Sequence, residues 1–162
     1  MFLPDDVYAT IESSMPIVCV DFVLVRRCAD GRVAELGLIE RESPFGRVWC
    51  HLGGRVRRGE TIVQAIRRHV EESLTGVRID IGDDTQPQHV YQWFPDDLAP
   101  APTFDFGRDS RKHAIGLSFA LDVIGDPEVV AGGEAISFAF TPPDALPRPL
   151  WPGCEALLGH LL

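Results

Sequence analysis

The chain has 162 residues, of which 45% are hydrophobic, and its formal net charge at pH 7 is -9. This length is enough for one hydrophobic core, so we expect a single domain over residues 1–162. The negative charge argues against a nucleic-acid polymer as partner, because phosphate backbones are bound by clustered basic side chains.

We expect neither a membrane segment nor an export signal. No run of the sequence approaches the ~20 apolar residues that a membrane helix needs, and the first residues lack the basic start and apolar core of a signal peptide. The four cysteines show no paired C-x-x-C spacing. We therefore expect no zinc site, and we expect the thiols to be reduced, in a cytoplasm.

The first third of the chain predicts a helix and three strands. Residues 5–13 favour a short helix. Residues 17–27 are rich in β-branched side chains, and an Ala-Asp-Gly turn signal leads from them to a second strand over residues 33–39. The two strands are therefore expected to form a hairpin. Residues 48–52 predict a short strand ahead of a glycine-rich loop.

A helix is predicted over residues 61–74. Its apolar residues recur at spacings of four or nearly so and make a core-facing stripe of Ala65, Ile66, Val70 and Leu74. Arg68, Glu72 and, one step round, His69 share another face. A lone helix of this pattern would be a surface helix with a solvated acidic end, but the glycines and Glu60 upstream favour a functional motif.

The second half predicts further strands over residues 77–81, 89–94, 113–123 and 135–140. Tyr91 and Trp93 alternate on one of them, as candidates to stack on a nucleobase or as core residues. The proline-rich residues 95–102 predict a loop that can cover a site. Residues 153–162 predict a last short helix, so the elements sum to a mixed sheet flanked by helices.

The stretch GGRVRRGETIVQAIRRHVEESLTG resembles the signature of the Nudix hydrolases. That signature is a Gly, five residues, a Glu, seven residues, Arg-Glu, an apolar residue, any residue, Glu-Glu, any residue, Gly and an apolar residue. The residues in register with it are Gly54, Glu60, Arg68, Val70 and Glu72. His69 and Ser73 replace two of its glutamates, and the glycine comes one residue late, at Gly76. The resemblance implies a Nudix-type α/β/α sandwich with a mixed β-sheet. His69 is expected to weaken metal binding, because magnesium prefers oxygen ligands.

Further segments are similar to the GDP-mannose mannosyl hydrolase branch of that family, over about residues 5–146. They are MPIVCVDFVLV, GLIERE, VYQWFPDD, KHAIGLSFAL and PPDAL. This resemblance implies a magnesium-dependent hydrolase of a nucleoside-diphosphate sugar, with manganese as a possible substitute ion. In that branch water attacks the anomeric carbon of the sugar and GDP leaves. The resemblance also implies a homodimer.

On the same resemblance, Asp21, Arg41 and Arg55 match residues that the branch uses on the sugar and the diphosphate. Arginine suits this task because its planar fork stays charged and binds two phosphate oxygens. Gly53 matches the glycine whose carbonyl binds magnesium, and Glu72 is expected to be the main helix carboxylate for the ion. The alternatives are a buried aspartate satisfied by its neighbours and solvated surface arginines.

The branch also has a Gln-His pair that supplies a metal ligand and the general base, and here Glu134 and Ala135 stand at that position. Glu134 is therefore a candidate metal ligand or base, with an exposed strand-start glutamate as the alternative. His113 is a candidate for substrate binding because imidazole titrates near neutrality, although a lone histidine at a strand start is more often structural.

Three functions stay open on the sequence. The first is hydrolysis of a nucleoside-diphosphate sugar at the sugar carbon. The second is attack of water on phosphorus, which gives a nucleoside monophosphate and a sugar phosphate. The third is a nucleotide-binding module without catalysis, which the losses at Ser73 and Ala135 favour.

Overall fold

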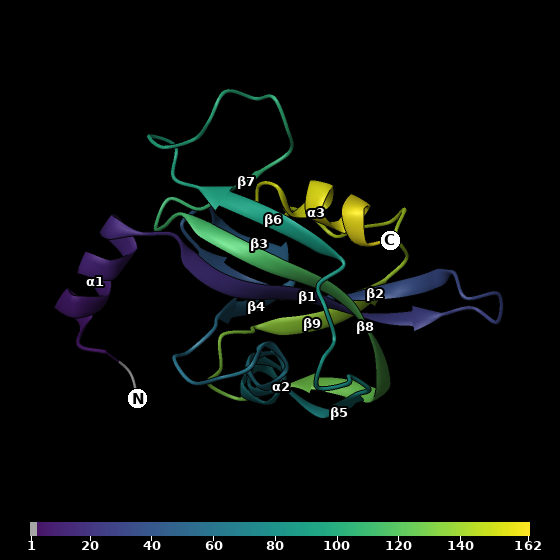
Figure 1. The fold of residues 1–162 in the computed structure, drawn as a ribbon. Helices are drawn as coiled ribbons and strands as arrows, with labels where there is room; N and C mark the ends of the chain where they lie inside the picture. Colours follow the sequence, from purple (N-terminus) through teal and green to yellow (C-terminus); the bar gives the residue numbers. More distant parts are fainter. Residues whose placement is uncertain (1–2) are drawn as a thin grey trace.

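A mixed β-sheet forms the centre of the fold, which the computed structural model describes for residues 3–162 (Figure 1). The strands are β1 (Ile17–Arg27), β2 (Val33–Ser43), β3 (Gly46–Cys50), β4 (Leu52–Arg55), β5 (Leu74–Ile79), β6 (His89–Phe94), β7 (Gly107–Arg108), β8 (Ala114–Val129) and β9 (Ser137–Thr141). The helices are α1 (Asp5–Ser14), α2 (Ile62–Ser73) and α3 (Cys154–Leu161). Strands pair in the order β3-β2-β1-β8-β6-β7, with β4 beside β1, β5 beside β8 and β9 beside β2. Because β1 is parallel to β8 and antiparallel to β2, the sheet is mixed.

The middle of the sheet is buried on both faces. In β1, residues 19–25 are all buried. A strand covered on both faces favours a continuous apolar run instead of strict alternation, and the sequence of β1 has such a run. Asp21 is the exception, because it is a carboxylate only 5% exposed in the middle of this strand.

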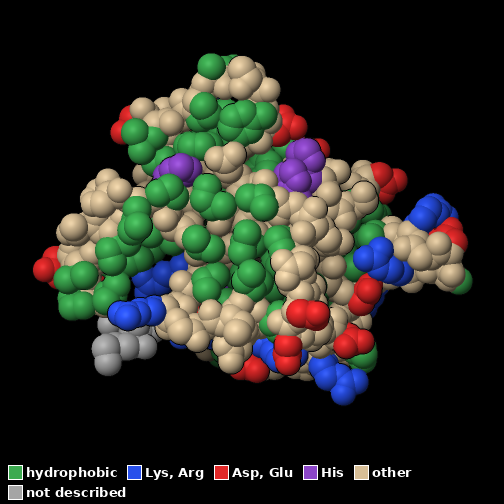
Figure 2. Space-filling model, in the orientation of Figure 1, with side chains coloured by type: hydrophobic (Ala, Val, Ile, Leu, Met, Phe, Trp, Pro, Cys, Tyr) green, Lys and Arg blue, Asp and Glu red, His purple; other side chains and the backbone are tan. Residues whose placement is uncertain are grey.

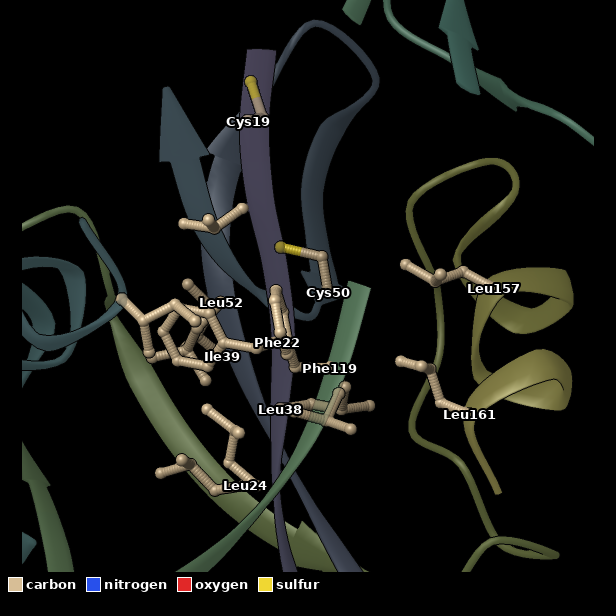
Figure 3. Packing of buried hydrophobic residues seen from close by; sticks show 14 of the residues in the cluster. Cys19, Phe22, Leu24, Leu38, Ile39, Cys50, Leu52, Phe119, Leu157 and Leu161 are labelled. Carbon is tan, nitrogen blue, oxygen red and sulfur yellow. The ribbon is translucent and has the colours of Figure 1, made fainter. Parts of the chain in front are cut away.

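Helices α2 and α3 cover opposite faces of the sheet (Figure 1), so the predicted α/β/α arrangement is confirmed. The predicted stripe of α2 is buried, with Ala65 and Ile66 both fully shielded from solvent. On the other side, Leu157 and Leu161 point from α3 toward the sheet (Figure 3). The short helix α1 has no buried residue and stands at the edge of the body. No helix among residues 3–162 has the length and apolar composition needed to cross a membrane.

Among residues 3–162, no helix covers one part of a sheet face. Val18 in β1 and Val90 in β6 are about half exposed, at 49% and 50%. Between them lie Ile115 and Leu117 of β8, which pair with Val18 and Val90 respectively. We call these four residues the open sheet patch. Figure 2 shows hydrophobic side chains gathered over this part of the molecule.

A capping box begins α2. The backbone N–H of Gln64 donates to the Thr61 hydroxyl at 3.1 Å, and the Thr61 N–H donates to the Gln64 side chain at 2.8 Å. These bonds satisfy two amide groups that a helix start otherwise leaves unpaired. The helix therefore begins directly after the glycine-rich loop, in the register that the sequence predicted.

Every predicted strand has a counterpart, but residues 3–162 form nine strands where the sequence predicted seven, because one predicted strand is divided and β7 was not predicted. The expected strand over residues 48–52 is two strands, because Cys50 pairs with Ile39 of β2 whereas Leu52 pairs with Phe22 of β1. His51 lies where the chain changes partner. The strand expected from residue 77 begins earlier, at Leu74 directly after α2.

Candidate functional site

A cavity of about 190 Å³ opens where the ends of several elements meet. Its walls come from β1, β2, the segment from β3 to β4, α2, and the loop that precedes β8. The ionisable residues that line it are Asp21, Arg41, His51, His69, Asp109, Arg111, Lys112 and Glu134. The cavity thus brings together residues that are up to 132 positions apart in the sequence, from Cys19 to Trp151.

Asp21 lies in this cavity, and both of its oxygens have neighbours. Trp93 Nε1 donates to Oδ2 at 2.8 Å, and His51 Nε2 lies 3.4 Å from Oδ1. The His51 ring also stacks on Trp93, with centroids 5.2 Å apart. Gly116 is required beside them, because a Cβ at that position would overlap Asp21 Oδ2. Asp21 is therefore a buried carboxylate satisfied by neighbours that also shape the cavity.

The charge of His51 follows from Asp21. Burial alone lowers the pKa of an imidazole, but the charge of Asp21 and the contact with its carboxylate outweigh burial and raise the pKa of His51 to about 10. His51 is therefore protonated at neutral pH, and the pair carries no net charge. No sequence pattern pointed to His51, because its role depends on the change of strand partner between β3 and β4.

Arg41 and Glu134 form an ion pair at the cavity wall. The Arg41 side chain is 17% exposed and that of Glu134 is 43% exposed. The Arg41 guanidinium also lies 5.5 Å from the centre of the Trp151 ring. The structure thus brings two of the predicted site residues into direct contact, with the carboxylate on the more exposed side.

Arg68 forms hydrogen bonds that connect the face of α2 carrying the predicted motif to the loop before it. Its guanidinium donates to both oxygens of Glu60, at 2.6 and 2.9 Å, and to Glu72 Oε2 at 3.1 Å. It also donates to the Arg55 carbonyl at 3.0 Å. Arg57 donates to the other oxygen of Glu72 at 3.1 Å. Hydrogen bonds from Arg68, above all, lower the pKa of Glu60 to about 2.

His69 lines the cavity beside this network. Its Nε2 lies 3.2 Å from the Arg55 carbonyl, and its Nδ1 lies 3.8 Å from Glu72 Oε2. Burial, and then the charge of Arg68, lower the pKa of His69, so the ring is neutral at pH 7. Gly54 is needed for this packing, because a Cβ there would lie 2.6 Å from His69 Cε1. The Gly54 match to the motif thus has a packing reason.

Two predicted substrate-binding residues lie outside the cavity lining. The Arg55 guanidinium lies over the ring of Tyr8 in α1, 4.1 Å from its centroid. His113 stacks on Phe94, with centroids 4.4 Å apart, and burial lowers its pKa. Tyr91 is 1% exposed, and its hydroxyl donates to a backbone carbonyl ahead of α3. The cavity therefore contains Asp21, Arg41, Gly53 and Glu134 of the predicted set.

The two carboxylates proposed for magnesium are both bound by arginines in this structure. Glu72 is 48% exposed and next to the cavity residue His69, but both of its oxygens are bound by arginines. Glu134 is bound by Arg41. Within residues 3–162 no three His, Cys, Asp or Glu side chains group closely enough to hold a metal ion. Magnesium is commonly held by one or two carboxylates with substrate phosphates as further ligands, and Gly53, Glu72 and Glu134 are the residues that would hold it here.

The position at which the resemblance expects a base histidine is closed. Ala135 is 6% exposed and packs in the hydrophobic core. An imidazole there would have to displace core side chains. A proton acceptor for water would therefore have to come from the cavity lining, where Glu134 and neutral His69 are the candidates.

The glycine-rich loop, the helix that follows and the mixed sheet define a Nudix-type fold. The chain belongs to the DUF4916 family, described as a domain of unknown function, whose model matches residues 2–149.

Three solved structures support the fold assignment. A protein from Jonesia denitrificans DSM 20603, described as a possible asymmetric diadenosine tetraphosphate hydrolase, is 28% identical over 91% of this chain and 92% of its own, with a TM-score of 0.76. A MutT NUDIX hydrolase from Burkholderia pseudomallei is 21% identical over 92% and 100%, with a TM-score of 0.70. The NUDIX domain of Shewanella oneidensis NrtR, in complex with ADP ribose, is 15% identical over 98% and 96%, with a TM-score of 0.60.

Asp21→Asn should change the charge of His51. Without the carboxylate, burial dominates and His51 becomes neutral at pH 7. In the unchanged protein a raised folded pKa stabilises the fold fully below about pH 6.5, the usual histidine value, and this contribution is lost as pH rises toward 10. NMR titration of the imidazole nitrogens measures both pKa values. A His51 that titrates near 6.5 in the unchanged protein would contradict this account.

Glu60→Gln should remove a pH-dependent part of the stability. The folded pKa of about 2 lies below the usual value of about 4.3, so the Arg68 pair stabilises the fold above that value. The contribution is lost as pH falls from about 4.3 to 2. Urea unfolding should show a loss on the order of 1 kcal/mol at pH 7, after allowance for solvent screening. Glu71→Gln, at an exposed glutamate of the same helix, is the control, and equal losses in both variants would sink the idea.

Proposed function

We propose that this chain hydrolyses a nucleoside diphosphate linked to a second group. The observation that carries the proposal is the cavity itself, where Arg41 and Glu134 stand beside the Nudix-type helix and its Glu72. An arginine at this place stabilises the charge that develops on a departing diphosphate. Gly53, Glu72, Glu134 and the diphosphate would hold a magnesium ion, which would add to the neutralisation of that charge. The ADP-ribose complex of a structurally similar domain supports a ligand of this class.

The finer proposal is a nucleoside-diphosphate sugar of the GDP-mannose type, cut by attack of water on the anomeric carbon. Its support is the sequence resemblance together with Asp21, which lines the cavity. Beyond the contacts with Trp93 and His51, the Asp21 carboxylate has further lone pairs that would accept from sugar hydroxyls. Water attack on phosphorus is the competing reaction, and the likeness to a protein described as a possible diadenosine tetraphosphate hydrolase favours it. The setting that we propose is the cytoplasm, in keeping with four unpaired cysteines.

A specific observation favours binding without turnover as a second candidate. Both oxygens of Glu72 are held by arginines, and the position of the family's base histidine carries the buried Ala135. A ligand would then bind to the cavity arginines while no residue activates water. General bases contribute roughly 10²- to 10⁴-fold, so slow turnover and no turnover are both consistent with the residues present.

Product analysis in ¹⁸O-labelled water, with GDP-mannose and magnesium, separates these candidates. Label in the sugar supports attack on carbon, and label in a phosphate supports attack on phosphorus.

Glu72→Gln should lower the magnesium-dependent rate at least ~10-fold, whereas Glu71→Gln, one position away on the same helix, should leave it unchanged. GDP-mannose binding without any product would support the binding module. Damage from Glu71→Gln instead of Glu72→Gln would contradict the assigned helix register.

The proposal includes a homodimer, which the resemblance implied. Its structural support is the open sheet patch, since contiguous exposed apolar surface marks interaction sites. The second copy would place the same patch against this one, as a twofold interface requires.

Val90→Asp should convert the dimer to a monomer in analytical ultracentrifugation. Ile124→Asp, at a residue 55% exposed on the distant end of β8, is the control and should remain dimeric. A monomeric unchanged protein would exclude this interface.

A further inference from the structure

Among residues 3–162, the charged side chains that line the cavity include one more cation than carboxylates. Three carboxylates each have a cationic partner, in the pairs Asp21 with His51, Glu134 with Arg41 and Asp109 with Arg111. Lys112 lines the same cavity and makes no ion pair with any residue between positions 3 and 162. The chain as a whole has a formal net charge of -9, whereas this lysine adds a positive charge that no ion pair offsets. Such a cation attracts an anionic ligand group.

Arg111 is fixed in place beside this lysine. Its Nε and Nη2 donate to the two oxygens of Asp109, at 2.9 and 2.8 Å, and its backbone N–H donates to Oδ1 at 3.0 Å. Asp109 itself is 5% exposed. The pairing uses two of the five N–H donors of the guanidinium, and the Arg111 side chain remains 42% exposed. The guanidinium is therefore oriented by the protein and still accessible to a ligand.

Trp151 links this wall of the cavity to the Arg41 wall. The guanidinium of Arg111 lies 5.1 Å from the centre of the Trp151 ring, and that of Arg41 lies 5.5 Å from it. Trp151 is 5% exposed, and its Nε1 donates to the Arg108 carbonyl at 2.6 Å. A buried indole held in this way limits where the two guanidinium groups can lie. The two guanidinium groups therefore lie close enough for a ligand whose diphosphate binds at Arg41 to reach Arg111 and Lys112.

We propose that the group beyond the diphosphate is itself anionic, and that Lys112 and Arg111 bind its carboxylate or phosphate. This inference rests on the proposed function and narrows the class of substrate. The Asp109 carboxylate feels the charge of Lys112 but is already bound by Arg111. A neutral hexose would therefore leave the Lys112 ammonium without an ion-pair partner, whereas an anionic group would pair with it. Arg111 adds fixed donors whose planar fork matches the oxygens of either anion.

Pairs of ligands that differ by one anionic group test this directly. GDP-mannose against GDP-mannuronate isolates a carboxylate, and ADP-ribose against ADP-ribose 1″-phosphate isolates a phosphate. Calorimetric titration of the full chain with magnesium should show at least ~10-fold tighter binding of the anionic member in one pair, which identifies the anion. Lys112→Gln should abolish that preference by weakening the anionic member alone. Arg58→Gln, an exposed arginine outside the cavity lining, is the control and should leave both affinities unchanged.

The other outcomes overturn the inference in distinguishable ways. Equal or tighter binding of the neutral member in both pairs means that the second group is not anionic, while the proposed function stands. Equal weakening of both members by Lys112→Gln places the lysine on the diphosphate instead, and this too overturns the inference alone. Absence of binding by all four ligands overturns the inference and the proposed function together.

Discussion

The contacts of Arg68 are the constraint on which the site depends. One guanidinium binds both oxygens of Glu60, one oxygen of Glu72 and the carbonyl of Arg55, so it joins the loop, the helix and the end of β4. The loop is thereby held against α2, and Gly54 lies against His69 at the cavity. Charge-assisted hydrogen bonds are about twice as strong as neutral ones, which suits a loop with little apolar surface to bury. The same arrangement occupies the carboxylates that a cation would use.

The carboxylates that hold the loop against α2 are the same ones that would bind a cation. For this reason the chain has the Nudix-type fold more clearly than it has a metal site for the Nudix reaction. Glu60 is committed to Arg68, and a cation must displace arginines to reach Glu72. Around the cavity, too, carboxylates are paired with cations instead of being grouped with one another. A site of this composition binds anions readily and binds a metal ion best when the substrate brings its own phosphate oxygens.

The sequence predicted those features that depend on local pattern. The apolar stripe of α2, the β1–β2 hairpin and the position of the glycine-rich loop all follow from periodicity and turn chemistry, and the structure confirms them. His51 was missed because the chain changes strand partner there, which is a long-range event that no local pattern records. Arg111 and Lys112 were missed because they lie in a polar loop without periodicity. The resemblance proposed Arg55 for the substrate, and the structure places its guanidinium over Tyr8 in α1.

A crystal structure of the full chain with GDP-mannose and Mn²⁺ would test the central claim most directly, because manganese can be located by its anomalous scattering. We expect the diphosphate in the cavity within contact distance of Arg41, with the metal ion on the side of Gly53 and Glu72. A nucleotide ordered elsewhere on the protein, with the Arg41–Glu134 and Arg57–Glu72 pairs unchanged and the cavity free of ligand, would contradict it.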